Sequence, residues 1–180
     1  MVFRIIRIGN EAMNSELWKK KWPMLLSSLL LIVLLVGLDQ WTKYAVDKAI
    51  PLGDSVVMVP GFFDLTNVRN TGAAFSMFSG MGMWFFIVLT IGAILAMIYY
   101  FIHTDDLKIE WCLALITAGA IGNLIDRVMF GYVRDFFQFY IFGWPFAIFN
   151  VADICVSVGF VLLVVFMIMD EWKEKKKNAG

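Results

Sequence analysis

The sequence has few of the residues on which hydrolytic and metal chemistry usually depends. Among 180 residues it holds one histidine, His103, and two cysteines, Cys112 and Cys155. A Ser/His/Asp triad is excluded because His103 lies apart from the other polar clusters, and a metal site of several His or Cys ligands is excluded by number. Both cysteines lie in apolar runs and are expected to pack as small apolar side chains. We therefore expect neither a metal nor an organic cofactor.

Charge is also scarce. Charged residues make up 17% of the chain and the formal net charge is zero, so the balance indicates no nucleic-acid partner. By contrast, 61% of the residues are hydrophobic, far more than in a soluble globular domain. Four stretches, 23–38, 83–102, 111–129 and 149–169, are apolar enough to cross a hydrocarbon core. The sequence thus predicts an all-α integral membrane protein with four transmembrane helices in one domain, 23–170.

Basic residues gather before the first span and after the last. The positive-inside rule therefore predicts that residues 1–22 and the basic residues 171–180 are cytoplasmic tails. An even number of spans agrees, and no small-residue cleavage site follows the first span, so we expect no cleavable signal peptide. Five basic residues on the outer side count against the rule, which raises the question of local partners: Lys43, Lys48, Arg69, Arg127 and Arg134.

Two outer segments lie between the spans. The first contains VVMVPGFFDLTNV, two β-favouring runs around Pro60 and Gly61, which predicts a hairpin or small sheet outside the hydrocarbon. The second, 130–149, is rich in aromatic residues, either as interfacial anchors or as an apolar platform for an acyl chain or a hydrophobic peptide; both roles can hold. These aromatic residues are Phe136, Phe137, Phe139, Tyr140, Phe142, Trp144 and Phe146.

Polar residues cluster at the outer ends of the spans. Asp39, Thr42 and Lys43 are spaced i, i+3, i+4 and share one helix face if the first helix continues that far. For Asp39 we favour a structural ion pair with Lys43 over a direct chemical role. Ionisable groups near membrane spans are costly and mark either function or such a pair.

The third span ends in GNLIDR, in which Asn123, Asp126 and Arg127 repeat the same spacing and are expected to point the same way. Asp126 is either catalytic or neutralises Arg127, and we favour the second role. The side chains on the neighbouring helix surface are small, so another helix can approach closely. These residues are Gly119, Ala120 and Gly122.

Two further aspartates complete the cluster. Asp135 lies in VRDF where the chain leaves the third span, and FNVAD supplies Asn150 and Asp153 at the opening of the fourth. Considered alone, Asp153 is equally well explained as a first-turn residue that the helix dipole stabilises. Four carboxylates nevertheless converge on one interface: Asp39, Asp126, Asp135 and Asp153.

A close pair of carboxylates cannot ionise fully at low cost, so it holds one proton near neutrality. One member can then activate a water while the other protonates the leaving amide. Water is therefore the expected nucleophile. The physical pattern does not choose between Asp135 and Asp126 as a member of that pair.

Five blocks resemble, in order and spacing, the signatures of the signal peptidase II family. They are DQWTK from Asp39, NVRNTGAAF from Asn67, GNLIDR from Gly122, VRDF from Val133 and FNVAD from Phe149. The resemblance covers about residues 25–169. It implies that Asp135 and Asp153 are the catalytic dyad and that further polar residues bind substrate or support the site: Asp39, Lys43, Asn70, Gly72, Asn123, Asp126, Arg127 and Asn150.

The resemblance also implies a substrate. It is a prolipoprotein whose signal helix precedes a diacylglyceryl-modified cysteine, and cleavage falls just before that cysteine. We expect a bacterial inner-membrane protein with its active site near the periplasmic face, in contact with membrane lipid and with no obligate protein partner. Gly72 is either a close-approach residue for substrate or a simple turn residue.

Two other classes of membrane protein are alternatives to a protease. A small proton-coupled transporter also carries intramembrane carboxylates, but transporters usually place them at the midplane and often show inverted repeats. This chain has its polar groups at one interface and no repeat. A structural membrane subunit would leave the convergence of the aspartates unexplained.

Overall fold

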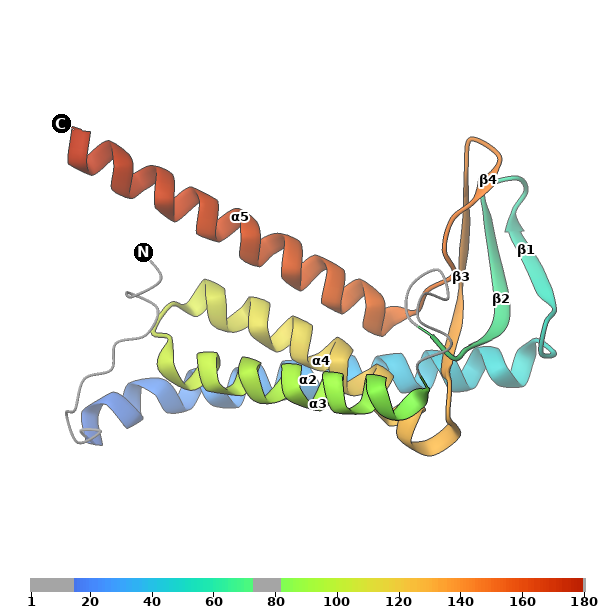
Figure 1. Cartoon of the computed structure of the whole chain (residues 1–180), viewed down its shortest axis with the longest axis horizontal. Helices are drawn as coiled ribbons and strands as arrows, with labels where there is room; N and C mark the ends of the chain where they lie inside the picture. Colours follow the sequence, from blue (N-terminus) through green and yellow to red (C-terminus); the bar gives the residue numbers. More distant parts are fainter. Residues whose placement is uncertain (1–14, 73–81, 180) are drawn as a thin grey trace.

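The computed structural model of the chain describes residues 15–72 and 82–179. Within these ranges, four helices are long and apolar enough to cross a membrane. The helices lie side by side, and α2 begins at the same end of the bundle at which α5 ends (Figure 1). The predicted four-span architecture is confirmed with the bounds α2 (Ser15–Ala49), α3 (Met83–His103), α4 (Leu107–Phe130) and α5 (Val151–Ala179).

Two helices extend well beyond the apolar stretches that predicted them. α2 starts before Pro23 and continues through the DQWTK block to Ala49, and α5 continues past Met169 through the basic residues that follow. Hydropathy marks only the part of a helix that contacts lipid, whereas backbone hydrogen bonding continues into the polar ends. The continuation of α2 places Asp39 and Lys43 on one helical face, as expected.

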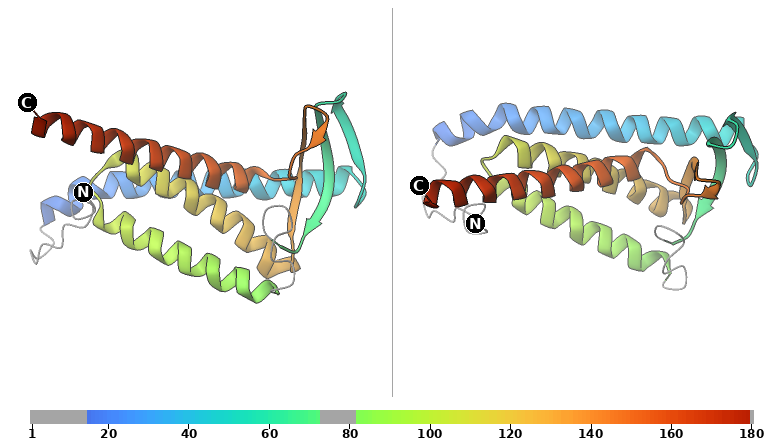
Figure 2. Two further views of the ribbon diagram at one scale, coloured as in Figure 1. Left: turned by 45° about the horizontal axis from the view of Figure 1, so that its top comes forward. Right: turned by 90° about the horizontal axis from the view of Figure 1, so that it is seen from above.

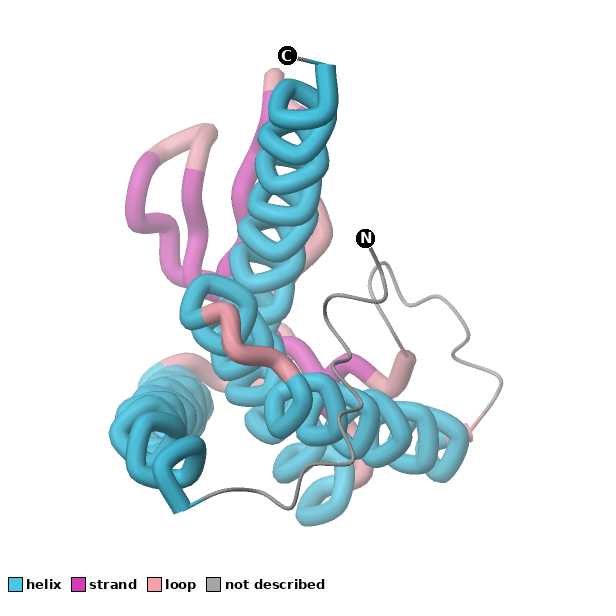
Figure 3. The backbone as a smooth tube through the Cα atoms, turned by 90° about the vertical axis from the view of Figure 1, so that its left-hand side faces the viewer, coloured by secondary structure: helices cyan, strands magenta, loops and turns pink. Residues whose placement is uncertain are grey.

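α4 is the central helix and packs against the other three (Figure 2). A Cβ atom built on Gly119 would lie 2.2 Å from the carbonyl oxygen of Ala152, so glycine is what allows α5 to approach this closely. Cys112 and Cys155 are buried and free, which confirms that they pack as apolar side chains. Viewed from the end at which α5 finishes, that half of α5 diverges from the other helices (Figure 3).

A four-stranded antiparallel sheet lies across the opposite end of the bundle, in the order β1-β2-β3-β4 (Figure 1). The predicted hairpin is confirmed, and it turns at Gly61, whose φ of 71° favours glycine. The second outer segment supplies β3 and β4, which the sequence did not predict. The bounds are β1 (Ser55–Val59), β2 (Phe63–Asn70), β3 (Val133–Ile141) and β4 (Trp144–Pro145).

The pairing of β2 with β3 joins the two outer segments and positions polar side chains. Val68 lies opposite Asp135, so Asn70, two residues farther along β2, presents its side chain on the same face as Asp135. Aromatic side chains consolidate this sheet, since Phe63 stacks on Phe139 with ring centroids 4.6 Å apart. Phe142, at the β3–β4 turn, is by contrast 99% exposed.

Candidate active site

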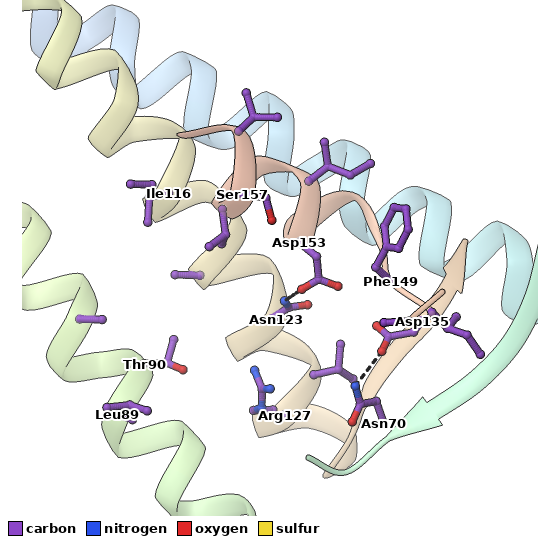
Figure 4. A pocket seen from close by; sticks show the side chains of 18 of the residues that line it. Asn70, Leu89, Thr90, Ile116, Asn123, Arg127, Asp135, Phe149, Asp153 and Ser157 are labelled. Atoms are coloured by element: carbon purple, nitrogen blue, oxygen red, sulfur yellow. Dashed lines mark hydrogen bonds between the residues drawn. The ribbon is translucent and has the colours of Figure 1, made fainter. Parts of the chain in front are cut away.

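A cavity of about 850 Å³ lies between α3, α4, α5 and β3. Its polar end is next to the sheet and its remaining lining is mostly apolar (Figure 4). Apolar side chains from three helices include Leu89, Ala93, Met97, Ile116 and Val156, and others come from β3 and the segment before α5. The polar lining comprises Asn70, Thr90, Asn123, Arg127, Asp135, Asp153 and Ser157. Five of the ten predicted site residues thus line one cavity.

Asp135 and Asp153 enter this cavity from different elements (Figure 4). Asp135 is the third residue of β3 and is 3% exposed. Asp153 is the third residue of α5, in its first turn. Strand and helix meet here because the segment between them folds back, with Phe149 paired to Phe137.

Asn150 connects the two aspartates and is fully buried. Its side-chain Nδ2 donates to Asp135 Oδ1 at 2.6 Å, and its backbone N–H donates to Asp153 Oδ2 at 3.1 Å. Its side-chain oxygen in turn accepts the Asp153 backbone N–H at 3.0 Å. This reciprocal pair is a capping box at the start of α5, so Asp153 has the expected helix-terminal role in addition to its place in the cavity.

The remaining carboxylate oxygens of the two aspartates also accept amide hydrogens. Asn70 Nδ2 donates to Asp135 Oδ2 at 2.9 Å, and Asn123 Nδ2 donates to Asp153 Oδ1 at 2.8 Å. Each of the four oxygens therefore has a neutral N–H donor. Among the ion pairs within residues 15–72 and 82–179, none involves Asp135 or Asp153.

The proton affinity of Asp135 reflects these surroundings. Burial is the main cause and the nearby charge of Asp153 the second, and together they raise the pKa of Asp135 from 3.8 to about 7. The hydrogen bonds from Asn70 and Asn150 oppose this rise without cancelling it. The site is consequently suited to hold a proton near neutrality.

A second group of polar residues lies behind the cavity wall, between α2 and α4. Lys43 Nζ is 2.9 Å from Asp39 Oδ2 and 3.4 Å from Asp126 Oδ2, and all three side chains are buried. Lys43 also donates to Asn123 Oδ1 at 3.0 Å, while Asp39 Oδ1 accepts the Ala152 backbone N–H at 2.9 Å. This is the structural ion pair favoured for Asp39.

The expectation that Asp126 neutralises Arg127 is wrong. Asp126 turns toward α2 and β3, where its partners are Lys43 and Arg134. Neighbouring residues on a helix point about 100° apart, so Asp126 and Arg127 face different surroundings. Arg127 lines the cavity, donates to the Gly72 carbonyl at 3.2 Å and lies over the Phe86 ring.

Gly72 follows β2 and has a turn-like environment. Its backbone N–H donates to Asn70 Oδ1 at 2.9 Å, and its carbonyl accepts from Arg127. These contacts support its role as a turn residue beside the cavity. The last three residues of the NVRNTGAAF block, 73–75, lie outside the described residues.

All five outer basic residues that oppose the positive-inside rule have local partners. Carboxylates pair with Lys43 and Arg134, and a backbone carbonyl accepts from Arg127. The other two lie over aromatic rings, Lys48 over Tyr44 and Arg69 over Tyr132. Each of these five basic residues therefore has a local interaction that accounts for its position.

Gln40 and Arg134 were not among the predicted site residues, yet both belong to the buried network. Gln40 Nε2 lies within hydrogen-bonding distance of Asp39, Asp126 and the Gly122 carbonyl, and its Oε1 accepts from Arg134 at 2.9 Å. Each residue is adjacent in sequence to a predicted aspartate. That adjacency is a signal, but it does not say which way the side chain points.

Comparisons with known proteins agree with this geometry. A family model described as signal peptidase (SPase) II matches residues 31–169. The chain belongs to the signal peptidase II family. Proteins named lipoprotein signal peptidase in two strains of Staphylococcus aureus are 39% identical over 155 residues, which is 85% of this chain and 94% of theirs. The resemblance drawn from the five blocks is thereby confirmed, and family membership makes the protein a membrane protease.

Two solved structures of bacterial membrane enzymes have the same fold. One superposes with a TM-score of 0.76 at 39% identity and covers 81% of this chain and 89% of its own. The other has a TM-score of 0.73 at 40% identity and covers 80% and 94%. Most of the fold of this chain is thus shared with these two bacterial membrane enzymes.

Proposed function

We propose that the protein is an aspartic endopeptidase that removes signal peptides from diacylglyceryl-modified prolipoproteins and cleaves just before the lipidated cysteine. One observation carries the proposal: Asp135 and Asp153 line one cavity, with Asn150 donating hydrogen bonds to both. The substrate class is supported by the five sequence blocks and by the name of the Staphylococcus aureus relatives.

The chemistry follows from two carboxylates that share one proton. The ionised aspartate takes a proton from water, and the water oxygen attacks the scissile carbonyl carbon. The protonated aspartate hydrogen-bonds to the carbonyl oxygen and then gives its proton to the amide nitrogen as the C–N bond breaks. The products are a carboxylate on the signal peptide and a free amine on the cysteine. The amide donors hold both carboxylates in place. Because these donors are neutral, they do not favour loss of the shared proton as a cation would.

The shape of the cavity suits a signal helix followed by a polar cleavage site. The apolar lining from α3, α4 and α5 receives the helix, and the polar end near the sheet receives the scissile bond. Asn123 and Arg127 border that polar end and can bind the peptide backbone. Phe146 and Phe149, which line the cavity beside Asp135, provide an apolar surface for the lipidated residue.

The proposed location is the bacterial inner membrane with the active site near its periplasmic face. The basic residues that end α5, among them Lys173, Lys175, Lys176 and Lys177, lie at the end of the bundle opposite the sheet. The positive-inside rule puts that end in the cytoplasm. The aspartates and the sheet then lie at the outer leaflet.

The test is mass spectrometry of a purified diacylglyceryl-modified precursor incubated with the purified full-length protein in lipid. We expect two products, the free signal peptide and a mature chain whose first residue is the lipidated cysteine. The matched control is the same precursor without the diacylglyceryl group, which should be cleaved far more slowly. No cleavage of the modified precursor by folded protein, or cleavage at another bond, would refute the proposed function.

A further inference from the structure

We propose that Arg134 is a positioning residue that holds Asp135 in its catalytic geometry by clamping the start of β3 onto Asp126. The proposal rests on the proposed function, because it assumes that Asp135 takes part in the chemistry. Arg134 immediately precedes Asp135 in β3 but belongs to neither the dyad nor the cavity lining. Its action would therefore pass through the backbone that the two residues share.

The contact between Arg134 and Asp126 is threefold. Asp126 Oδ2 accepts the Arg134 backbone N–H at 2.9 Å and the Nε–H at 3.2 Å, while Oδ1 accepts from Nη2 at 2.8 Å. Asp126 is fully buried and Arg134 is 8% exposed. A two-point contact from the guanidinium fixes orientation as well as distance, and the backbone contact transfers that fixed position to the strand.

The Arg134 backbone is also held on the other side of its Cα atom, at the peptide group that joins it to Asp135. The Arg134 carbonyl oxygen accepts from Asn150 Nδ2 at 3.3 Å, and the same Nδ2 donates to Asp135 Oδ1. The backbone of Arg134 is thus held at its N–H by Asp126 and at its carbonyl by Asn150. Little freedom remains for the Cα atom of Asp135, which directly follows.

The surrounding charges explain why a lysine cannot fully replace this arginine. Lys43 is shared between Asp39 and Asp126. Arg134 is therefore the cation that pairs with Asp126 and not also with Asp39. Arg134 also donates to Gln40 Oε1 and lies over the Phe130 ring, 4.7 Å from its centroid. A lysine retains the charge but loses the planar fork and most of these simultaneous contacts.

The test measures kcat and KM for the diacylglyceryl-modified precursor, per folded protein, in Arg134→Gln and Arg134→Lys. Arg134→Gln should lower kcat by about tenfold to a hundredfold, the size expected for a misplaced catalytic group, with KM changed less than about twofold. Arg134→Lys should recover part of this loss. The matched control is Arg69→Gln, because Arg69 lies directly opposite Arg134 on β2 but is exposed, and its kcat should stay unchanged.

A double-variant cycle separates positioning from general destabilisation. If Arg134 and Asp126 act as one clamp, Arg134→Gln combined with Asp126→Asn should lower kcat little more than either change alone. Unchanged kcat in folded Arg134→Gln, or losses that multiply in the double variant, would overturn the proposal. If Arg134→Gln does not fold, kcat is measured in Arg134→Lys instead. A kcat equal to that of the wild type in Arg134→Lys would then overturn the proposal. Failure of wild-type protein to cleave the precursor would instead refute the proposed function.

Discussion

Three buried aspartates and the half-buried Asp153 lie at the sheet end of the bundle, and they form two pairs with different kinds of partner. Asp39 and Asp126 are paired with two cations, Lys43 and Arg134. In the hydrogen bonds described above, Asp135 and Asp153 accept only from neutral amide groups. The pairs are neighbours, because Asn123 accepts from Lys43 and donates to Asp153.

The difference shows how one protein uses the same side chain for two purposes. A buried carboxylate with a cationic partner stays charged and is costly to disturb. A buried carboxylate with amide partners keeps its orientation but can bind or release a proton, because no cation in direct contact with it holds it in the ionised form. We therefore assign stability chiefly to the Asp39/Asp126 pair and proton transfer to the Asp135/Asp153 pair.

The largest expected effect is on catalysis. Asp135→Asn keeps the size of the side chain and much of its hydrogen bonding, but removes the proton-exchanging group. Turnover of the lipidated precursor should fall by about a thousandfold or more, while the melting temperature stays at or above that of the wild type. Turnover within tenfold of wild type would show that the amide-held pair does not perform the chemistry.

The next effect is on stability. Asp39→Asn leaves the buried Lys43 without its nearest carboxylate and should lower the free energy of unfolding by about 3 kcal/mol or more. Turnover per folded protein should fall by a smaller factor than in Asp135→Asn. Thermal and denaturant unfolding in lipid or detergent measure this change.

A second variant serves as the control. Asp39→Asn combined with Lys43→Met removes both charges of the pair and should recover part of the lost stability, since no buried cation is left without its nearest carboxylate. If Asp39→Asn melts like the wild type but has lost its activity, the assignment of stability to the Asp39/Asp126 pair and of proton transfer to the Asp135/Asp153 pair is incorrect.

The smallest expected effect is the pH dependence. Because the pKa of Asp135 is raised in the folded protein from 3.8 to about 7, the folded state binds this proton more tightly than the unfolded state. The contribution of Asp135 to stability is therefore greatest at low pH and is lost as pH rises through this window. Melting temperatures at pH 5 and pH 8 should differ less in Asp135→Asn than in the wild type, and an equal difference would show that Asp135 is not responsible.

Much of the fold could be predicted from sequence because it depends on local patterns. The four apolar runs determine the four spans, and the turn residues at Pro60 and Gly61 mark the first hairpin. The strand β3 was overlooked because its many aromatic residues also suit an interfacial belt. Its backbone partners in β2 lie more than 60 residues away in sequence, and such pairing is set by the tertiary structure.

Within the site, contacts along one helix could be predicted from sequence, whereas contacts between distant segments could not. Helical spacing correctly paired Asp39 with Lys43, because both residues lie on one helix. It wrongly assigned Asp126 to Arg127, because the partners of Asp126, Lys43 and Arg134, lie on α2 and β3, which only the folded chain brings alongside α4. The capping box of Asn150 and Asp153 was accessible from spacing, whereas the additional bond from Asn150 to Asp135 depends on how β3 meets α5.

Precursor cleavage by purified Asp153→Asn shows whether the amide-held pair of aspartates performs the chemistry. Asp153 also caps α5, so melting and turnover must be measured on the same preparation. We expect folded protein that yields no detectable mature chain beginning with the lipidated cysteine, while Asp39→Asn retains measurable turnover per folded molecule. If folded Asp153→Asn cleaves the precursor at a rate close to wild type, Asp153 is not part of the catalytic pair.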